Sequence, residues 1–339
     1  MGMQQVWVGV DVSAKKLQIA AASERQRWTG VVSNDAVGHR SLIKKLRQMG
    51  REIFVGLEAT GNYGLDLAVA LHQAGIHVMR INPRAVSQFA KAMLQRSKTD
   101  RSDADVILAF VQRMNFECWT PPSKAALELR TLSRHIQAVK ALLVVEKNRL
   151  HAAEVVSSTP RVIVSDLKRS IAAIVARVER LEEECLEVIG TDSELQERFN
   201  LLAGTVGYGV TSTIMVLSEL AVLPADMTAR QWTAYAGLDP RQFESGTSVA
   251  KPDRISKAGN RYLRGALYLP ALTAVRCNAN VRAFYEKLVT RGKKPKQAQV
   301  AVMRKMLHAI HAMFRTNHAF DGEKFYSTQN AAQASAHAA

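Results

Sequence analysis

The sequence has 339 residues, of which 47% are hydrophobic and 22% charged, so it is long enough for two or three domains and is not disordered as a whole. Its 46 Lys and Arg residues outweigh 30 Asp and Glu residues and give a net charge of +16. A polyanion is the natural partner of such a chain. Nucleic acid fits better than a membrane surface, because no lipidation signal or amphipathic anchor accompanies the charge.

Residues 1–118 alternate strand and helix patterns, which predicts a mixed α/β domain whose first strands are antiparallel. The runs VWVGVDV and LQIAAAS fit a hairpin, and WTGVVS fits a third strand. Two more strands, EIFVGL and HVMRIN, alternate with helices at HRSLIKKLRQMG, LDLAVALHQAG, RAVSQFAKAM and DADVILAFVQRM. Gly50 and Gly75 each follow a predicted helix, at the position where glycine commonly ends one.

Four acidic residues of this domain have the order and setting of a metal site. Asp11 and Glu58 end apolar runs that are typical of buried strands. Asp100 and Asp103 are three residues apart on a predicted helix, so both lie on one face. Carboxylates gathered at the edge of a sheet can hold two Mg²⁺ ions about 3.5–4 Å apart for phosphoryl transfer, and Mn²⁺ accepts the same ligands. The four acids therefore predict a two-metal site.

Each of these acids also has a simpler explanation when it is taken alone. Asp11 fits a turn or cap residue, and Asp100 fits a capping box with Ser97. Glu58 is harder to explain structurally, because the preceding IFVGL should be buried and an ionised group there needs a partner. Asp105 would point to another side of the helix and stays outside the group.

The WTPP run at 119–122 marks a domain boundary, and residues 119–190 predict an antiparallel helical coiled-coil hairpin. Apolar residues recur mostly three and four apart over two stretches, which SSTP at 157–160 separates. The first stretch contains Leu129, Leu132, Ile136, Val139, Leu143 and Leu150, and the second contains Leu167, Ile171, Ile174, Val178, Leu181, Cys185 and Val188. The same seams would also suit pairing with a second chain, so both arrangements fit the pattern.

Residues 191–326 predict a mainly α-helical domain, and the low-complexity tail at 327–339 is predicted to be disordered. The domain opens with LLAGTVGYGVTSTIMVLSEL, in which a glycine-rich turn separates two helices. This order resembles a helix-hairpin-helix, whose turn presents backbone N–H groups to a phosphate. It does not fit a dinucleotide fingerprint, because GxxGxG is not GxGxxG and no strand precedes it.

A second group of polar residues lies in QFESGTSVAKPDRISKAGNRYLRGALY. Ser245 begins a short polar loop whose small residues leave the hydroxyl accessible, although a loop without a covalent role is the simpler explanation from the residues alone. Between Lys251 and Thr316 there are fifteen Lys and Arg residues but only two acids, and the spacing of the basic residues suits binding along a phosphate backbone. The predicted nucleic-acid contacts are Lys251, Arg254, Lys257, Arg261, Arg264, Lys293, Lys294 and Lys296.

The remaining signals concern the compartment. Cys118, Cys185 and Cys277 are far apart and lack the spacing of a disulfide framework or a zinc site, which fits a reducing cytosol. The N-terminal segment has no basic region followed by a long apolar one, so it predicts no export signal. The longest weakly charged stretch, at 201–223, contains three glycines and Glu219 and makes a poor membrane span. We therefore expect a cytoplasmic bacterial protein, associated with the nucleoid and not with a membrane.

Six motifs, in this order and spacing, resemble a known family. They are GVDVSAKK, LEATGNY, INP, SKTDRSDA, AYAGLDPRQFESGTSV and SKAGNRYLRGALY, and they span nearly the whole chain. The sequence is similar to DEDD transposases of the "IS one-ten" type, which are relatives of the Piv DNA invertase. Its glycine-rich turn reads TVGYG where relatives often have a PGIG turn, a difference that touches no catalytic position.

The resemblance implies a RuvC-like, RNase H-like N-terminal domain in which Asp11, Glu58, Asp100 and Asp103 bind Mg²⁺. It implies a C-terminal transposase domain in which Ser245 is the nucleophile. The expected activity is recombination that joins insertion-sequence ends to target DNA through a phosphoserine intermediate. A bridge RNA would guide the reaction, and the protein would assemble as a dimer to tetramer on donor and target DNA.

Two other functions remain compatible with the residues. A metal-dependent RuvC-like endonuclease or junction resolvase would use the carboxylates with water and no covalent intermediate, and Ser245→Ala would leave its hydrolysis intact. A nucleic-acid-binding protein without catalysis would keep its activity in cells after Asp11→Ala or Glu58→Ala. No RNA-binding signature separates RNA from DNA as the polyanion.

Overall fold

The computed structural model describes residues 5–59, 63–94, 100–245 and 249–328, with only the backbone at 100–101, 242–245 and 249–253. The chain divides into two compact units, unit 1 at Met1–Pro121 and unit 2 at Pro122–Ala339. The division falls inside the WTPP run, because Trp119 still packs against the core of unit 1. The tail predicted to be disordered lies outside the described residues from 329 onward.

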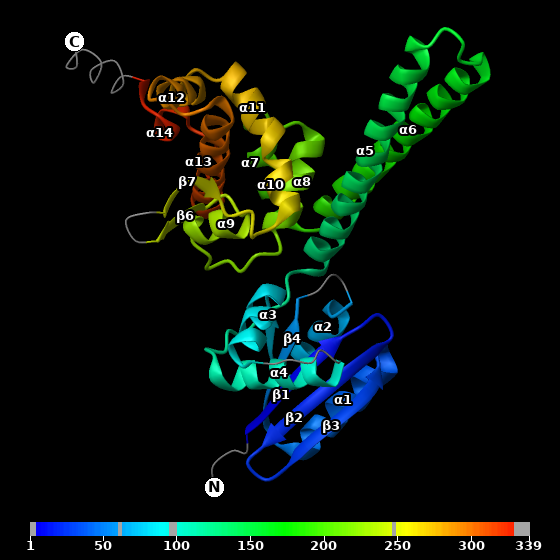
Figure 1. Cartoon of the computed structure of the whole chain (residues 1–339), viewed down its shortest axis with the longest axis vertical. Coiled ribbons are helices and arrows are strands. Elements are labelled where there is room, and N and C mark those ends of the chain that lie inside the picture. The colour runs from blue at the N-terminus through cyan, green and yellow to red at the C-terminus, as the bar shows by residue number, and fades with distance from the viewer. Residues whose placement is uncertain (1–4, 60–62, 95–99, 246–248, 329–339) are drawn as a thin grey trace, which may run out of the picture. The chain divides into compact units, whose positions relative to one another are not determined.

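Unit 1 is built on a five-stranded mixed sheet with the order β3-β2-β1-β4-β5 (Figure 1). The strands are β1 (Gln5–Val12), β2 (Lys16–Ser23), β3 (Arg27–Ser33), β4 (Glu52–Glu58) and β5 (His77–Ile81). Strand β2 is antiparallel to β1 and β3, whereas β4 is parallel to both β1 and β5. The predicted antiparallel start of a mixed sheet is confirmed, and this strand order is that of the RNase H-like fold.

Helices cover both faces of this sheet, and two separate cores result. On one face, α1 (Ala36–Met49) and α2 (Leu65–Gln73) bury Leu42, Leu46 and Leu71 against the valines of β1. On the other face, α3 (Pro83–Ala92) and α4 (Asp100–Arg113) pack around Ile107. Since side chains alternate between the faces of a strand, consecutive residues of β1 and β4 contribute to different cores.

The two glycines predicted to end helices differ in conformation. Gly75 has φ +74°, the left-handed backbone that glycine adopts without a steric penalty, as the prediction requires. Gly50 has φ 176°, which is extended backbone open to any residue. Gly50 therefore follows the end of α1 as predicted, but without the left-handed backbone that glycine often has there.

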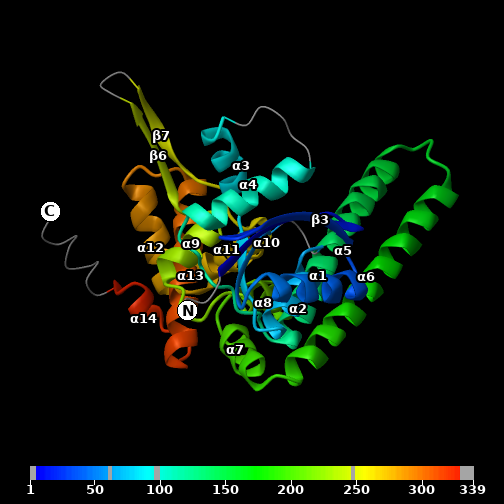
Figure 2. The ribbon, with the colours of Figure 1, turned by 90° about the horizontal axis from the view of Figure 1, so that it is seen from below.

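Unit 2 begins with two long helices, α5 (Lys124–Val155) and α6 (Arg161–Gly190), which lie side by side (Figures 1 and 2). The seams predicted from the sequence face each other within this one chain. Leu129, Ile136 and Cys185 are fully buried near the base of the pair, while the seam residues further along are half-buried. The helical hairpin is observed, and coiled-coil geometry remains a prediction.

In its described residues, the rest of unit 2 consists of helices and a two-stranded sheet. Its helices are α7 (Ser193–Ala203), α8 (Val210–Leu220), α9 (Ala229–Tyr235), α10 (Arg261–Ala266), α11 (Tyr268–Cys277), α12 (Ala279–Thr290), α13 (Pro295–Thr316) and α14 (Gly322–Phe325). Apolar residues at helical spacing bury α13 in the centre of this unit, where it contacts α7, α9, α11, α12 and α14. Within the described residues, no helix has both the length and the apolarity that crossing a membrane requires.

Candidate active site and nucleic-acid interface

Asp11 and Glu58 are neighbours across the two central parallel strands. Val10 of β1 pairs with Leu57 of β4, and the two acids are the next residues of their strands. Val10 and Leu57 point into the core under α1 and α2, so alternation directs both acids to the opposite face. Neighbouring strands lie about 4.8 Å apart, which places both half-buried carboxylates at one edge of the sheet.

Helix α4 lies directly on this face because glycine leaves room for it. A Cβ atom on Gly9 would lie 2.2 Å from the backbone nitrogen of Leu108 and 2.3 Å from the carbonyl oxygen of Ala104. The register partner of Gly9 is Gly56, where a Cβ atom would lie 2.2 Å from Cγ1 of Val111. Ala104 is therefore held against β1, the strand that carries Asp11.

The first turn of α4 contains the other two predicted acids. Asp103 is half-buried and precedes Ala104, while Asp100 is the first residue of the helix and is described by its backbone only. Ser97, its suggested capping partner, lies outside the described residues. Asp105, which the prediction left out of the acidic group, accepts a hydrogen bond from Arg27 at 2.7 Å and forms an ion pair with it. The fold thus brings Asp11, Glu58 and the Asp103 turn to one face of the sheet.

The acids of this face have the donor chemistry of a hard divalent cation, since carboxylate oxygens are the ligands that Mg²⁺ and Mn²⁺ prefer. Among the described side chains, which do not include that of Asp100, no three His, Cys, Asp or Glu residues form a group that could hold a metal ion.

Two residues that sequence reasoning missed support the same edge of the sheet. The side-chain amide of Asn34 donates to the carbonyl oxygens of Ser13 and Tyr63, each at 2.9 Å. These carbonyls belong to the segments that follow β1 and β4, so Asn34 holds together the two loops next to Asp11 and Glu58. Because the Asn34 nitrogen is used in this way, its oxygen accepts from Nε2 of His39 at 2.9 Å. Burial lowers the pKa of His39, which favours this neutral donor form.

Ser245 is the last residue of β6 (Pro240–Ser245), which pairs in antiparallel fashion with β7 (Val249–Ile255). The sequence did not predict these two strands, and the short polar loop that it predicted after Ser245, at 246–248, lies outside the described residues. Pairing runs from Pro240 with Ile255 to Ser245 with Val249 through backbone hydrogen bonds, which side-chain pattern does not reveal. The two strands form an arm that leaves the helical body of unit 2 (Figure 2).

The predicted nucleic-acid contacts fall into two groups. Arg254 is exposed on β7 of the arm, and Lys257 and Arg261 are exposed just after it, while the side chain of Lys251 is outside the described part. Lys293 and Lys294 are exposed between α12 and α13, and Lys296 is exposed in the first turn of α13. Arg264 is half-buried and donates to the carbonyl oxygen of Ala236 at 2.9 Å, so it also has a structural contact.

The glycine-rich turn of unit 2 joins α7 and α8, as the sequence predicted. The first helical turn of α8 lies beside a carboxylate, because the hydroxyl of Thr211 donates to Glu182 at 2.6 Å. Lys140 also approaches this carboxylate, at 3.9 Å. A negative side chain near a helix N-terminus already compensates its partial positive charge. The turn is therefore a weaker phosphate site than its sequence indicates.

The fold and the acidic edge together define a class of protein. An RNase H-like sheet with carboxylates at the ends of β1 and β4 and on the covering helix is the arrangement of metal-dependent enzymes that act on nucleic acid.

Comparison with known proteins identifies the family. Residues 8–154 match a model of DEDD transposases of the IS110 type, and residues 200–286 match one described as "Transposase IS116/IS110/IS902 family". The chain belongs to this family of transposases, whose substrate is DNA, and membership implies dependence on a divalent metal.

Relatives match over most of their length. The pilin gene-inverting protein of Moraxella bovis is 26% identical over 94% of this chain and 98% of its own. The 42 kDa protein of insertion element IS900 from Mycobacterium paratuberculosis is 26% identical over 92% of this chain and 96% of its own. Among solved structures, RuvC of Thermus thermophilus with a Holliday junction is similar over 34% of this chain and 98% of that chain, with 17% identity and a TM-score of 0.27.

Proposed function

We propose that this protein catalyses Mg²⁺-dependent cleavage, exchange and rejoining of DNA strands at the ends of an insertion sequence. The observation that carries the proposal is the position of Asp11 and Glu58, adjacent across β1 and β4 on the face that α4 covers. The first turn of α4 supplies Asp100 and Asp103. Relatives named for the inversion of a pilin gene support recombination rather than cleavage alone.

In this proposal Asp11, Glu58, Asp100 and Asp103 hold two divalent cations, Mg²⁺ or Mn²⁺. When bound, the cations would polarise the scissile phosphate and stabilise the leaving oxygen. The sheet and α4 are rigid elements, so they hold the carboxylates of the edge in place before DNA arrives. Asn34 contributes by fixing the two loops next to the acids.

Ser245 is the proposed nucleophile. Its Oγ attacks the scissile phosphorus, a phosphoserine ester forms, and the bond from phosphorus to a deoxyribose oxygen breaks. The hydroxyl proton passes to a carboxylate and then to the leaving oxygen. Attack on the ester by the hydroxyl of another strand reverses these steps and releases the serine. Because the ester conserves the energy of the phosphodiester, rejoining requires no ATP.

The reaction requires both units of the chain, since unit 1 contains the carboxylates and unit 2 contains Ser245. We propose that copies of the chain assemble as a dimer or tetramer on DNA. Association of copies is supported by apolar side chains that α5, α6 and their connection leave exposed. They are Leu142, Val144, Val145, Val155, Val156, Val162, Ile163 and Val175. Exposed apolar side chains are a feature of interaction sites where they lie next to one another.

A bridge RNA is the proposed guide, and the exposed cations on and after the arm and around the start of α13 would bind its phosphates and those of DNA. With DNA as substrate, the protein would act at the bacterial nucleoid. Purification of the protein from cells that contain its insertion element, followed by sequencing of bound RNA, tests the guide. Recombination by RNA-free protein at the rate of the loaded protein would exclude it.

The decisive test of the chemistry is the covalent adduct. Wild-type protein with its RNA, Mg²⁺ and a plasmid containing the element ends should form a protein–DNA adduct that Ser245→Ala abolishes together with strand exchange. A junction resolvase without a covalent intermediate would keep cleaving DNA after that substitution.

The carboxylates are tested with a matched pair on one helix. Asp103→Asn should lower the rate of DNA cleavage by at least about 100-fold, the usual effect of removing a group that acts in the transition state. Asp105→Asn removes the same charge two residues further on, where the acid pairs with Arg27, and should retain activity. Equal losses in both variants would exclude a specific role for Asp103.

A further inference from the structure

A buried carboxylate in unit 2 is not explained by the chemistry above. Glu219 on α8 is 0% exposed, and its neighbours Val216, Leu217 and Leu220 are also buried. An ionised side chain inside an apolar core is costly unless charges and hydrogen bonds compensate it. The partners of Glu219 therefore show what this carboxylate does.

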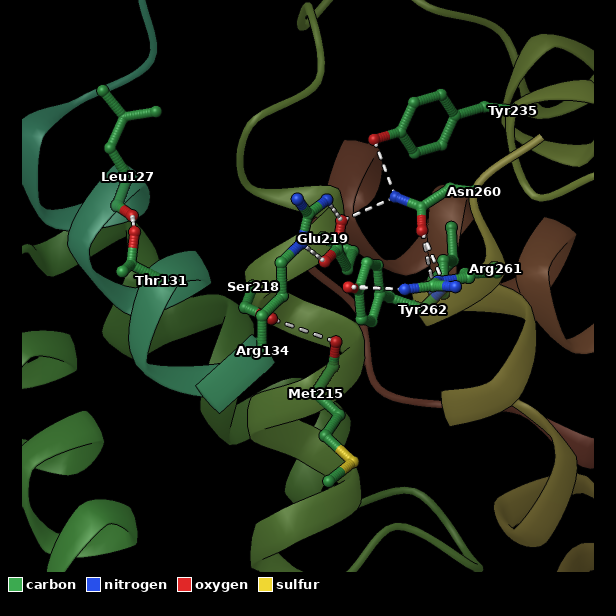
Figure 3. Close-up of polar contacts among 11 residues, drawn as sticks. Leu127, Thr131, Arg134, Met215, Ser218, Glu219, Tyr235, Asn260, Arg261 and Tyr262 are labelled. Atoms are coloured by element: carbon green, nitrogen blue, oxygen red, sulfur yellow. Dashed lines mark hydrogen bonds and ion pairs between the residues drawn. The ribbon is translucent and has the colours of Figure 1, made fainter. Parts of the chain in front are cut away.

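The first partner is Arg134 of α5 (Figure 3). Its Nε donates to Oε1 of Glu219 at 2.6 Å, and its Nη2 donates to Oε2 at 2.9 Å. The guanidinium also lies over the ring of Tyr262, 4.6 Å from its centre. Two parallel hydrogen bonds to one carboxylate fix both distance and angle, so this contact ties the helical hairpin to α8.

The second partner is Asn260, which precedes α10. Its Nδ2 donates to Oε2 of Glu219 at 2.6 Å and to the hydroxyl of Tyr235 at 2.9 Å. Its Oδ1 accepts from the backbone N–H groups of Tyr262 and Leu263, at 2.8 and 3.2 Å. Both ends of the amide are used, so Glu219 determines which way Asn260 faces and thereby supports the cap of α10.

The segment that Asn260 ends is fixed to the base of the Ser245 arm. Ser256 follows β7 and donates to a carboxylate oxygen of Asp239, just before β6, at 2.6 Å. Lys257 has φ +51°, and its N–H donates to Gly237. Gly259 lies so close to Tyr235 that a Cβ atom would be 2.0 Å from its carbonyl oxygen. Residues 256–260 therefore connect the arm to Glu219 through a run of specific contacts.

We propose that Glu219 is a positioning residue for strand exchange. Through Asn260 it fixes the base of the arm that carries Ser245, and through Arg134 it joins that base to the α5–α6 hairpin. A buried ion pair contributes little net stability over apolar packing, whereas it specifies one arrangement of the elements it joins. The inference rests on the proposed function in one respect only, the role of Ser245.

The test exchanges the donor and the acceptor of the hydrogen bond between residues 219 and 260. Asn260→Asp keeps a good cap for α10 but places two carboxylates in contact, and Glu219→Gln leaves the half-buried Arg134 without its counter-charge. Each single variant should slow adduct formation by about 100-fold, the effect of a small misplacement of a reacting group. In the double variant the new amide of residue 219 donates to the new carboxylate of residue 260, which should restore most of the rate.

Two further measurements separate positioning from stability. Hydrogen exchange of the amides at 256–263 should accelerate in each single variant and return towards the wild-type rate in the double variant. Leu307→Ala, a fully buried change on α13 outside this set of contacts, serves as the control with matched loss of thermal stability. It should retain the wild-type adduct rate at temperatures where it is folded.

The outcomes are distinct. If hydrogen exchange of the amides at 256–263 is unchanged in the single variants, the proposal is overturned, whatever the rate of adduct formation. Accelerated hydrogen exchange together with a wild-type rate of adduct formation also overturns the proposal, since Glu219 would then have a structural role only. The proposal is likewise overturned if the double variant recovers thermal stability but not the rate of adduct formation. If Ser245→Ala retains strand exchange, the proposed function fails and the link to the serine is overturned, while the exchange data still show whether Glu219 anchors the segment.

Discussion

The contact between α4 and the sheet gives the sharpest test of how unit 1 holds its acids. In Gly9→Ala the added methyl would lie 2.2 and 2.3 Å from backbone atoms of α4, which cannot rotate away. The whole helix must move, so the cost should approach or exceed the upper end of the roughly 1–3 kcal/mol typical of overpacking. In Gly56→Ala the methyl meets Cγ1 of Val111 at 2.2 Å, a side-chain atom that gives way at the cost of a less favourable valine rotamer, so the cost should be smaller than that of Gly9→Ala.

Urea unfolding of the full-length variants measures this difference, with hydrogen exchange of β1 and α4 as the local probe. Because the displaced helix includes Asp103, Gly9→Ala should also lose DNA cleavage under conditions where the protein remains folded. Equal destabilisation by the two alanines, or full cleavage by Gly9→Ala, would refute the reasoning that the bare backbone of Gly9 sets the position of the acidic turn.

Two other predictions concern titratable groups. Burial lowers the pKa of His39 below its usual 6.5, so the unfolded chain binds more protons in that range and the unfolding free energy of unit 1 should fall as pH drops below 6.5. Chemical denaturation across this range should show a weaker pH dependence in His39→Gln, and an unchanged one would exclude His39 as its source. Burial raises the pKa of the Cys185 thiol to about 12, so maleimide near neutral pH should label the exposed Cys118 and Cys277 first. Mass spectrometry should find Cys185 modified only after unfolding, and early labelling there would contradict its burial.

Local patterns account for what could be predicted in unit 1. The alternation in VWVGVDV and the run in EIFVGL identify β1 and β4, and the i,i+3 spacing in SKTDRSDAD puts two acids in one helical turn. These signals depend on residues close together in the chain. They could not reveal that α4 contacts Gly9 and Gly56, because that contact joins segments separated by many residues.

The candidate site shows the same division. Ser245 could be selected from its motif, but its place at the end of a paired strand depends on backbone hydrogen bonds to β7. Asn34 and His39 gave no signal, since a polar residue between a strand and a helix, or in the first turns of a helix, has many ordinary uses. Arg264 differs, because the sequence predicted it to contact nucleic acid from its charge, and the structure shows that it also donates a hydrogen bond to the carbonyl oxygen of Ala236.

The sequence by itself determined that the chain is basic, that acids end two apolar runs typical of buried strands, and that two apolar seams run through its middle. Those properties are written in composition and short-range periodicity. Only the tertiary structure decided that the seams face each other within one chain, and that Glu219 joins Arg134 to Asn260. The physical reason is burial, because a carboxylate removed from water must find its partners in space, wherever the chain brings them.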